Sequence, residues 1–266
     1  MGEELALGND PRYSGPALKA SFLAAALENR AKVLDYGLIP TPALAFQTKA
    51  LGRSAGIMIT ASHNPPEYNG FKVFNMSGEA LDDETRLSLK NPKPLLYNGR
   101  ASSLEPADPR EYRELLSRIV FKKWKVVLDC GNGAASQLAP SIYRERLDKV
   151  TSINSYPDGG FPGRGSEPTR KSVQTLGSMV VETHFDAGIA FDGDADRMYI
   201  VDEKGVCPCK IEYSHPTSPS FRKDPKGRSW SRSMPLWSWM KWPRRQARGW
   251  FEGLWVMLSF CGKQSG

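Results

Sequence analysis

Residues 55–72 read Ala-Gly-Ile-Met-Ile-Thr-Ala-Ser-His-Asn-Pro-Pro-Glu-Tyr-Asn-Gly-Phe-Lys, an apolar run followed by a polar loop. The apolar part, 55–59, is short, contains β-branched residues and is bounded by turn residues, which predicts a buried strand. Asn64 precedes two prolines, so helix is disfavoured there and the backbone beyond it is restrained. Loops at strand ends commonly carry the chemistry of α/β folds. We therefore expect a stiff loop that presents the hydroxyl of Ser62.

A second polar segment, Phe191-Asp-Gly-Asp-Ala-Asp-Arg197, also follows an apolar run, 187–190. If its backbone is extended, Asp192, Asp194 and Asp196 point to one side of the chain. Carboxylates crowded in this way repel one another unless a cation lies between them. Oxygen ligands of this kind suit Mg²⁺, so the segment predicts a magnesium site. An ordinary solvated turn is the alternative for either segment.

Together the two segments resemble the α-D-phosphohexomutase superfamily, of the phosphomannomutase/phosphoglucomutase kind, whose T-A-S-H-N-P and D-G-D-x-D-R loops both stand here unchanged. The resemblance implies that Ser62 carries a phosphoryl group and holds Mg²⁺ together with the three aspartates. Phosphoryl transfer depends chiefly on positioning, a metal and cationic side chains, which these residue types can supply. The resemblance also implies catalytic roles for His63 and Lys72. It implies substrate binding by Arg12, Asn64 and Arg197.

Further segments extend the resemblance over about residues 5–205. Gly-Asn-Gly at 131–133 is weak evidence for phosphate binding, and we expect a tight strand-to-helix turn there. Proline and an alanine- and leucine-rich composition predict a helix over 16–29. The matching segments are the G-x-D-x-R-x-S-G turn at 8–15, the D-x-G-x-x-x-T-P segment at 35–42, the strand and glycine turn at 126–133, and the long loop at 158–169.

Alternating strand and helix signals predict an α/β fold with two domains, each a parallel or mixed sheet covered by helices on both faces. We expect the first domain over 1–97 and the second over 122–205. Residues 98–121 would form a polar, proline-containing linker with a helix near 110–119. By resemblance these are the family's domains I and II. The resemblance also implies that a first strand, with an active-site arginine, and the family's domains III and IV are missing.

The remaining segment, 206–266, has a composition unlike the rest of the chain, and we expect it to be irregular. Residues 207–266 hold 11 Lys and Arg against 3 Asp and Glu, and six of the seven tryptophans, so the net charge of +7 originates here. A basic, tryptophan-rich composition of this kind can bind anionic membranes or single-stranded nucleic acid. Prolines at 235 and 243 interrupt any regular period, and the apolar run 254–260 is too short to span a bilayer.

We therefore expect no nucleic-acid and no membrane partner. We interpret the segment as out-of-frame translation that begins just after Gly205, with a natural divergent tail as the alternative. Residues 1–9 are acidic and lack an apolar core, unlike a signal peptide, so we expect a cytoplasmic location. Cys130 is expected to be buried at the end of its strand.

The function that the resemblance implies is an isomerase acting on a hexose phosphate. Phosphorylated Ser62 would donate to the sugar, a bisphosphate would turn over, and the serine would recover a phosphate. Phosphoglucosamine specificity stays open, because the family's sugar contacts lie in domain III. Without domains III and IV the loss of orientation can cost several powers of ten in rate, so a non-catalytic fragment is the second hypothesis. A haloacid-dehalogenase-type phosphatase with Asp192 as nucleophile is a third, although Asp196 departs from that pattern.

Overall fold

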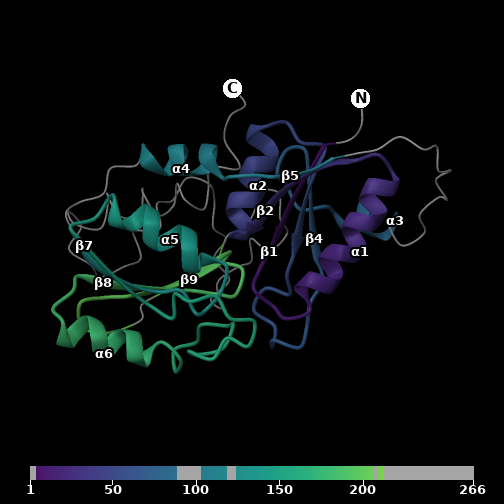
Figure 1. Ribbon diagram of the computed structural model, residues 1–266. Coiled ribbons are helices and arrows are strands. Elements are labelled where there is room, and N and C mark those ends of the chain that lie inside the picture. Colours follow the sequence, from purple (N-terminus) through teal and green to yellow (C-terminus); the bar gives the residue numbers. More distant parts are fainter. Residues whose placement is uncertain (1–3, 89–102, 119–123, 207–208, 213–266) are drawn as a thin grey trace.

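The computed structural model describes residues 4–88, 103–118, 124–206 and 209–212. Figure 1 shows two α/β units next to each other, each built on a twisted sheet with helices packed against it. This confirms the predicted fold class, two α/β domains with mixed sheets. Within the described part of the chain, no helix is both long enough and apolar enough to cross a membrane.

The first unit contains, in chain order, β1 (Glu4–Asn9), α1 (Gly15–Glu28), β2 (Lys32–Leu38), α2 (Thr41–Ala50), β3 (Ala55–Ile59), β4 (Phe71–Asn75), α3 (Asp83–Ser88) and β5 (Leu104–Pro106). Its sheet has the order β4-β3-β1-β2-β5, with β4 antiparallel to β3 and the other pairs parallel. Successive side chains of a strand face opposite ways. Ala6 therefore packs with the residues of α2 and Leu7 with those of α1, so both faces of the sheet are covered.

The second unit contains β6 (Lys125–Asp129), α5 (Ala135–Arg144), β7 (Lys149–Ile153), α6 (Gln174–Glu182), β8 (Ala187–Phe191), β9 (Arg197–Val201) and β10 (Cys209–Glu212). Its sheet has the order β10-β9-β8-β6-β7, with β9 antiparallel to both β8 and β10. Val126 and Leu128 pack with α5, whereas Val127 packs with α6 on the opposite face. Figure 1 shows these two helices on opposite sides of the sheet.

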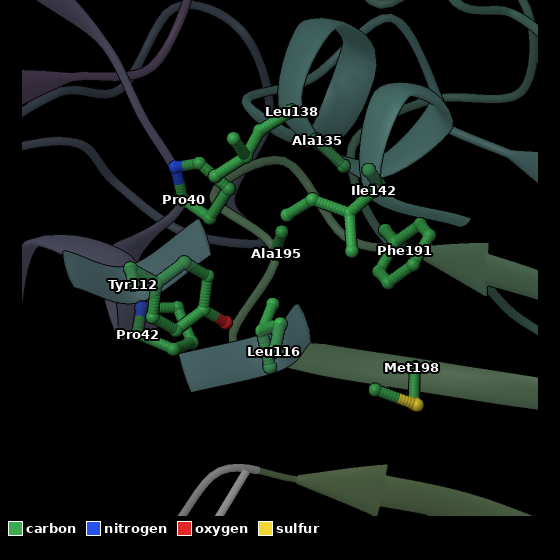
Figure 2. A pocket seen from close by; sticks show the side chains of 11 residues that line it. Pro40, Pro42, Tyr112, Leu116, Ala135, Leu138, Ile142, Phe191, Ala195 and Met198 are labelled. Carbon is green, nitrogen blue, oxygen red and sulfur yellow. The ribbon is translucent and has the colours of Figure 1, made fainter. Parts of the chain in front are cut away.

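Helix α4 (Arg110–Ser117) joins the two units through apolar contacts. Its buried Tyr112 and Leu116 belong to one cluster that contains both α2 of the first unit and Leu138 and Ile142 of α5. A cavity of about 30 Å³ lies at this junction. Figure 2 shows side chains from α4, α5, the start of α2 and the loop before β9 around it. The two units thus share an apolar core, which fixes the loops of one relative to the loops of the other.

Most predicted elements are found, with two differences. The predicted helices over 16–29 and near 110–119 are α1 and α4, and Cys130 is buried. Part of the expected linker is strand β5, which extends the first sheet beside β2. The expectation of irregular backbone beyond residue 205 is wrong for Cys209–Glu212, because β10 covers the edge of β9, whose backbone groups would otherwise lack partners. Residues 207–208 and 213–266, with the tryptophan-rich segment, lie outside the described residues.

Candidate functional site

The loop between β3 and β4, residues 60–70, carries Ser62 to the boundary between the two units. Ser62 has a left-handed backbone, with φ of 54°, and is 7% exposed. Its N–H donates to Thr60 Oγ1 at 2.8 Å. Its Oγ lies 3.3 Å from Asp192 Oδ2 on the other unit. A non-glycine residue held in this conformation is uncommon and is typical of sites where surrounding contacts override a local cost.

Arg12 lies beneath this loop and holds it through both terminal nitrogens of its guanidinium. Nε donates to Asp10 Oδ2 at 2.9 Å, and the side chains of both residues are fully buried. Nη1 and Nη2 donate at 2.5–2.8 Å to four backbone carbonyls of the loop, those of Ser62, Asn64, Pro65 and Tyr68. The predicted stiffness of the loop thus has a visible cause. Arg12 is 1% exposed and its side-chain hydrogen bonds go to Asp10 and to this loop. The substrate-binding role expected of it stays a prediction.

The second unit also contacts the loop. Ser166 Oγ lies 2.9 Å from the carbonyl oxygen of His63 and 2.8 Å from that of Asn64. Gly193 comes so close that a Cβ there would meet the carbonyl oxygen of Ser62 at 2.7 Å. The Phe161 ring lies over the Arg12 guanidinium, 5.1 Å from its centroid. The serine loop is therefore packed on both units rather than projecting from one.

The aspartate segment forms the short loop between β8 and β9. It is a turn, with φ of 59° at Ala195 and a hydrogen bond from the Ala195 N–H to the Asp192 carbonyl at 3.1 Å. The expectation of extended backbone is wrong, because the chain must reverse direction between two antiparallel strands within five residues. The three aspartates are nevertheless gathered in one place, as expected. Carboxylate oxygens of Asp192, Asp194 and Asp196 lie within 4.8 Å of one another.

Two residues of the first unit hold the aspartate loop. Lys72 Nζ donates to Asp194 Oδ2 at 2.6 Å and to Asp196 Oδ2 at 2.7 Å. Thr41, at the start of α2, donates its hydroxyl to Asp194 Oδ2 at 2.5 Å and its N–H to the Asp194 carbonyl at 2.9 Å. Thr41 lies in the D-x-G-x-x-x-T-P segment, but nothing in the sequence marks it as a partner of a residue 153 positions away.

The carboxylates titrate under opposing influences. Burial, reinforced by the charges of Asp196 and Asp194, raises the pKa of Asp192 well above its usual value. Burial and the charge of Asp194 likewise raise the pKa of Asp196. Burial acts in the same direction on Asp194, but the contact with Lys72 holds the pKa of this carboxyl below its ordinary value. The Asp194 and Asp196 charges in turn raise the pKa of Lys72 against the effect of its burial. The cluster is therefore rich in negative charge that a further cation would relieve.

The donor atoms fit a divalent cation with a preference for oxygen. Asp194 Oδ1 and Asp196 Oδ1 are buried and accept no hydrogen bond within the described residues. Buried carboxylate oxygens are normally satisfied, so two together need an explanation. The hydroxyl of Ser62 faces the same cluster through Asp192. A small cation such as Mg²⁺, which binds one or two carboxylates and keeps further positions for water or phosphate, suits this set.

The other predicted residues lie around the rim. Arg197 Nη1 donates to Glu167 Oε2 at 3.2 Å, and His63 Nδ1 lies 4.0 Å from the same oxygen. Arg197 Nε is 3.8 Å from Asp196 Oδ1. The side chain of Asn64 is exposed. The structure thus brings cationic groups to the mouth of the cluster, and it adds Glu167, to which the sequence assigned no role.

Known proteins match this chain in two blocks. Residues 1–91 match the family described as phosphoglucomutase/phosphomannomutase, alpha/beta/alpha domain I, and residues 111–205 match domain II of the same family. Phosphoglucosamine mutase of Clostridioides difficile is 40% identical over 214 residues, covering 76% of this chain and 47% of that protein. Phosphopentomutase of Thermococcus kodakarensis is 40% identical over 210 residues, covering 75% and 46%.

Among solved structures, a phosphoglucomutase/phosphomannomutase family protein from Burkholderia thailandensis aligns with a TM-score of 0.66 and 26% identity. The alignment covers 77% of this chain and 48% of that one. The chain spans about half the length of the curated relatives it matches. The two matched domains contain both of the loops described above. The chain accordingly belongs to the α-D-phosphohexomutase superfamily and carries the first two of its α/β domains.

Proposed function

We propose that this chain carries the phosphoryl-transfer centre of a phosphohexomutase, in which Ser62 accepts and returns a phosphoryl group. The observation that supports it best is the meeting of the two loops. The Ser62 hydroxyl lies 3.3 Å from Asp192 Oδ2, at the edge of three clustered carboxylates. The hydroxyl and the carboxylates come from different domains, and holding them together is a task that phosphoryl transfer requires.

The residues around Ser62 have different roles in the proposed phosphoryl transfer, according to where they lie. Asp192 Oδ2 lies 3.3 Å from the Ser62 hydroxyl and orients it toward the carboxylate cluster. Lys72 and Arg197 place positive charge where a transferring phosphoryl group gathers negative charge, and the His63 imidazole lies next to Glu167 beside them. The three aspartates would hold Mg²⁺, which supplies further charge neutralisation when bound. Arg12 contributes by holding the serine loop, and the substrate contact expected of it from the sequence stays a prediction.

The substrate class that we propose is a hexose phosphate. The names of the relatives include phosphoglucosamine mutase, phosphomannomutase and phosphopentomutase, so glucosamine phosphate is the first sugar to test. The described loops contain groups for a phosphate and a metal. A non-catalytic fragment is the alternative, favoured by the chain spanning about half the length of those relatives.

Intact-mass spectrometry after incubation with glucose 1,6-bisphosphate and Mg²⁺ tests the proposal. The wild-type chain should gain the mass of one phosphoryl group, Ser62→Ala should gain none, and the exposed control Ser77→Ala should behave as wild type. Peptide mapping should place the group on Ser62, and an acyl phosphate on Asp192 would favour phosphatase chemistry instead. A wild-type chain that stays unmodified would contradict the proposal.

A turnover assay separates the enzyme from the fragment. Conversion of glucosamine 6-phosphate to glucosamine 1-phosphate, or of the glucose phosphates, should depend on Ser62 and on Mg²⁺. Turnover that disappears in Ser62→Ala would exclude the non-catalytic fragment. Phosphorylation of Ser62 without turnover would instead show that the transfer centre works and that the sugar cannot be reoriented by these two domains alone.

A further inference from the structure

Ser166 contacts both active-site loops, and neither the motifs nor the proposed mechanism uses it. It precedes Glu167 in the long loop before α6 and is 5% exposed. Its hydroxyl lies within hydrogen-bond distance of the carbonyl oxygens of His63 and Asn64, at 2.9 and 2.8 Å. Its own carbonyl accepts the N–H of Gly193, within the aspartate loop, at 2.9 Å. Ser166 therefore contacts the backbone of the serine loop and the backbone of the aspartate loop.

The serine loop has few backbone hydrogen bonds of its own. Thr60 pairs with Gly70 at its base, and single turns form from Asn64 to Ala61 and from Tyr68 to Pro65. Buried carbonyl groups need partners, so the rest must come from side chains. Arg12 supplies them from below, within the first domain. Among the hydrogen bonds of the described residues, those of the Ser166 hydroxyl join this backbone to the second domain.

The distance that phosphoryl transfer needs is the one between Ser62 Oγ and the carboxylates of the other domain. Arg12 makes the serine loop rigid. A displacement of His63 and Asn64, which Ser166 contacts, therefore displaces Ser62 as well. The bond from Gly193 anchors Ser166 to the aspartate loop, one residue from Asp192. Displacements of about 1 Å at a reacting group can cost two powers of ten in rate.

We propose that Ser166 is a positioning residue: its hydroxyl and carbonyl together set the separation of the serine loop from the aspartate loop. Its hydrogen bonds within the described residues go to backbone groups of His63, Asn64 and Gly193, so it acts through the two backbones. The effect on chemistry rests on the proposed phosphoryl transfer at Ser62. The effect on the loop does not, and the two can be measured separately.

Hydrogen–deuterium exchange of the full chain, followed on peptides over residues 60–70, tests the loop. Ser166→Ala removes the hydroxyl without adding bulk. Exchange at 62–68 should become about 5–10-fold faster, as expected for the loss of roughly one hydrogen bond. The matched control is Ser172→Ala, in the same chain segment, whose hydroxyl bonds within the described residues to Thr169 alone. The control should exchange like wild type in the serine loop.

The second measurement is the rate of Ser62 phosphorylation by glucose 1,6-bisphosphate, beside the affinity for Mn²⁺ as a probe of the carboxylates. Ser166→Ala should slow phosphorylation at least about 10-fold and leave Mn²⁺ affinity within about 3-fold, because Thr41 and Lys72 still hold the aspartates. Unchanged exchange at 62–68, or parallel losses in exchange protection, phosphorylation and Mn²⁺ affinity, would overturn the inference. If the wild-type chain is not phosphorylated, the proposed function fails, and the exchange result still decides the role of Ser166.

Discussion

The two domains are built on one strand plan, yet their corresponding loops differ in how they are held. Strands β1 to β4 have the same order and directions as β6 to β9. The serine loop joins β3 to β4 through residues 60–70, and the aspartate loop joins β8 to β9 through residues 192–196. Equivalent loops of two similar domains thus face each other across the domain boundary. In the function that we propose, the serine loop supplies the nucleophile and the aspartate loop supplies the metal ligands.

The difference follows from loop length. The long loop cannot satisfy its own carbonyls, so buried Arg12 and Ser166 hold it from outside. The short loop closes by backbone hydrogen bonds, and outside contacts fall on its side chains, where Lys72 and Thr41 bind Asp194. Because the long loop is held through its backbone carbonyls, the Ser62 side chain remains available for reaction. A short turn crowds three side chains together, which is what a cation site needs.

The largest effect should come from the shared core that sets the two loops against each other. Leu116→Ala removes a fully buried side chain from the cluster between the domains, and we expect a loss of about 2–5 kcal/mol in the free energy of unfolding. Chemical denaturation followed by circular dichroism measures it. Leu87→Ala, exposed on α3, is the control and should change little. A loss below 1 kcal/mol would mean that the domains do not depend on this contact.

The ligand role of the short loop is tested by Asp194→Asn. Removal of a central carboxylate should weaken Mn²⁺ binding by at least about 100-fold, more than the change of an outer partner usually costs. Electron paramagnetic resonance titration of free Mn²⁺ gives the affinity. Asp148→Asn, on the surface of the same domain, should bind as wild type. Equal affinities in the two variants would contradict a metal site at this loop.

The close approach of the loops is tested at Gly193. A Cβ there would meet the Ser62 carbonyl oxygen at 2.7 Å, so Gly193→Ala should destabilise the protein by about 1–3 kcal/mol and separate the loops. Gly70→Ala is the control in the long loop, because its Cβ would lie 3.8 Å from the nearest atom. Thermal unfolding and Ser62 phosphorylation measure the two consequences. Similar melting temperatures for both variants would show that the contact between the loops can be relaxed.

The smallest effect concerns charge in the short loop. Because burial raises the pKa of Asp192 in the folded state, its ionisation destabilises the fold as pH rises from about 4 through the folded pKa. In EDTA at pH 7, Asp192→Asn should therefore raise the melting temperature, by about 2–4 °C per kcal/mol gained. The gain should vanish toward pH 4, where the wild-type carboxyl is protonated in both states. A gain that is independent of pH would point to packing rather than charge.

The sequence predicted correctly those features of the candidate site that depend on adjacent residues. The apolar runs before Ser62 and Asp192 are strands, and the structure brings the two loops together as their chemistry requires. The argument from extended backbone at Asp192–Asp196 was wrong in mechanism, because a tight turn can gather side chains that a strand would align. The substrate contact expected of Arg12 stays a prediction, and its side chain is buried beneath the serine loop. Its motif identifies an important residue but says nothing about which way a side chain points.

Local patterns in this chain determined the strands, the helices and the identity of the reactive groups. Periodicity, prolines and motif spacing act within a few residues, and they are visible without any knowledge of the fold. Only the tertiary structure decided the burial of Arg12 beneath the serine loop of its own domain. The bond from Thr41 to Asp194 and the double contact of Ser166 were decided by the packing of one domain on the other. Such contacts join residues 50 to 153 positions apart, and a single sequence carries no signal for distances of that kind.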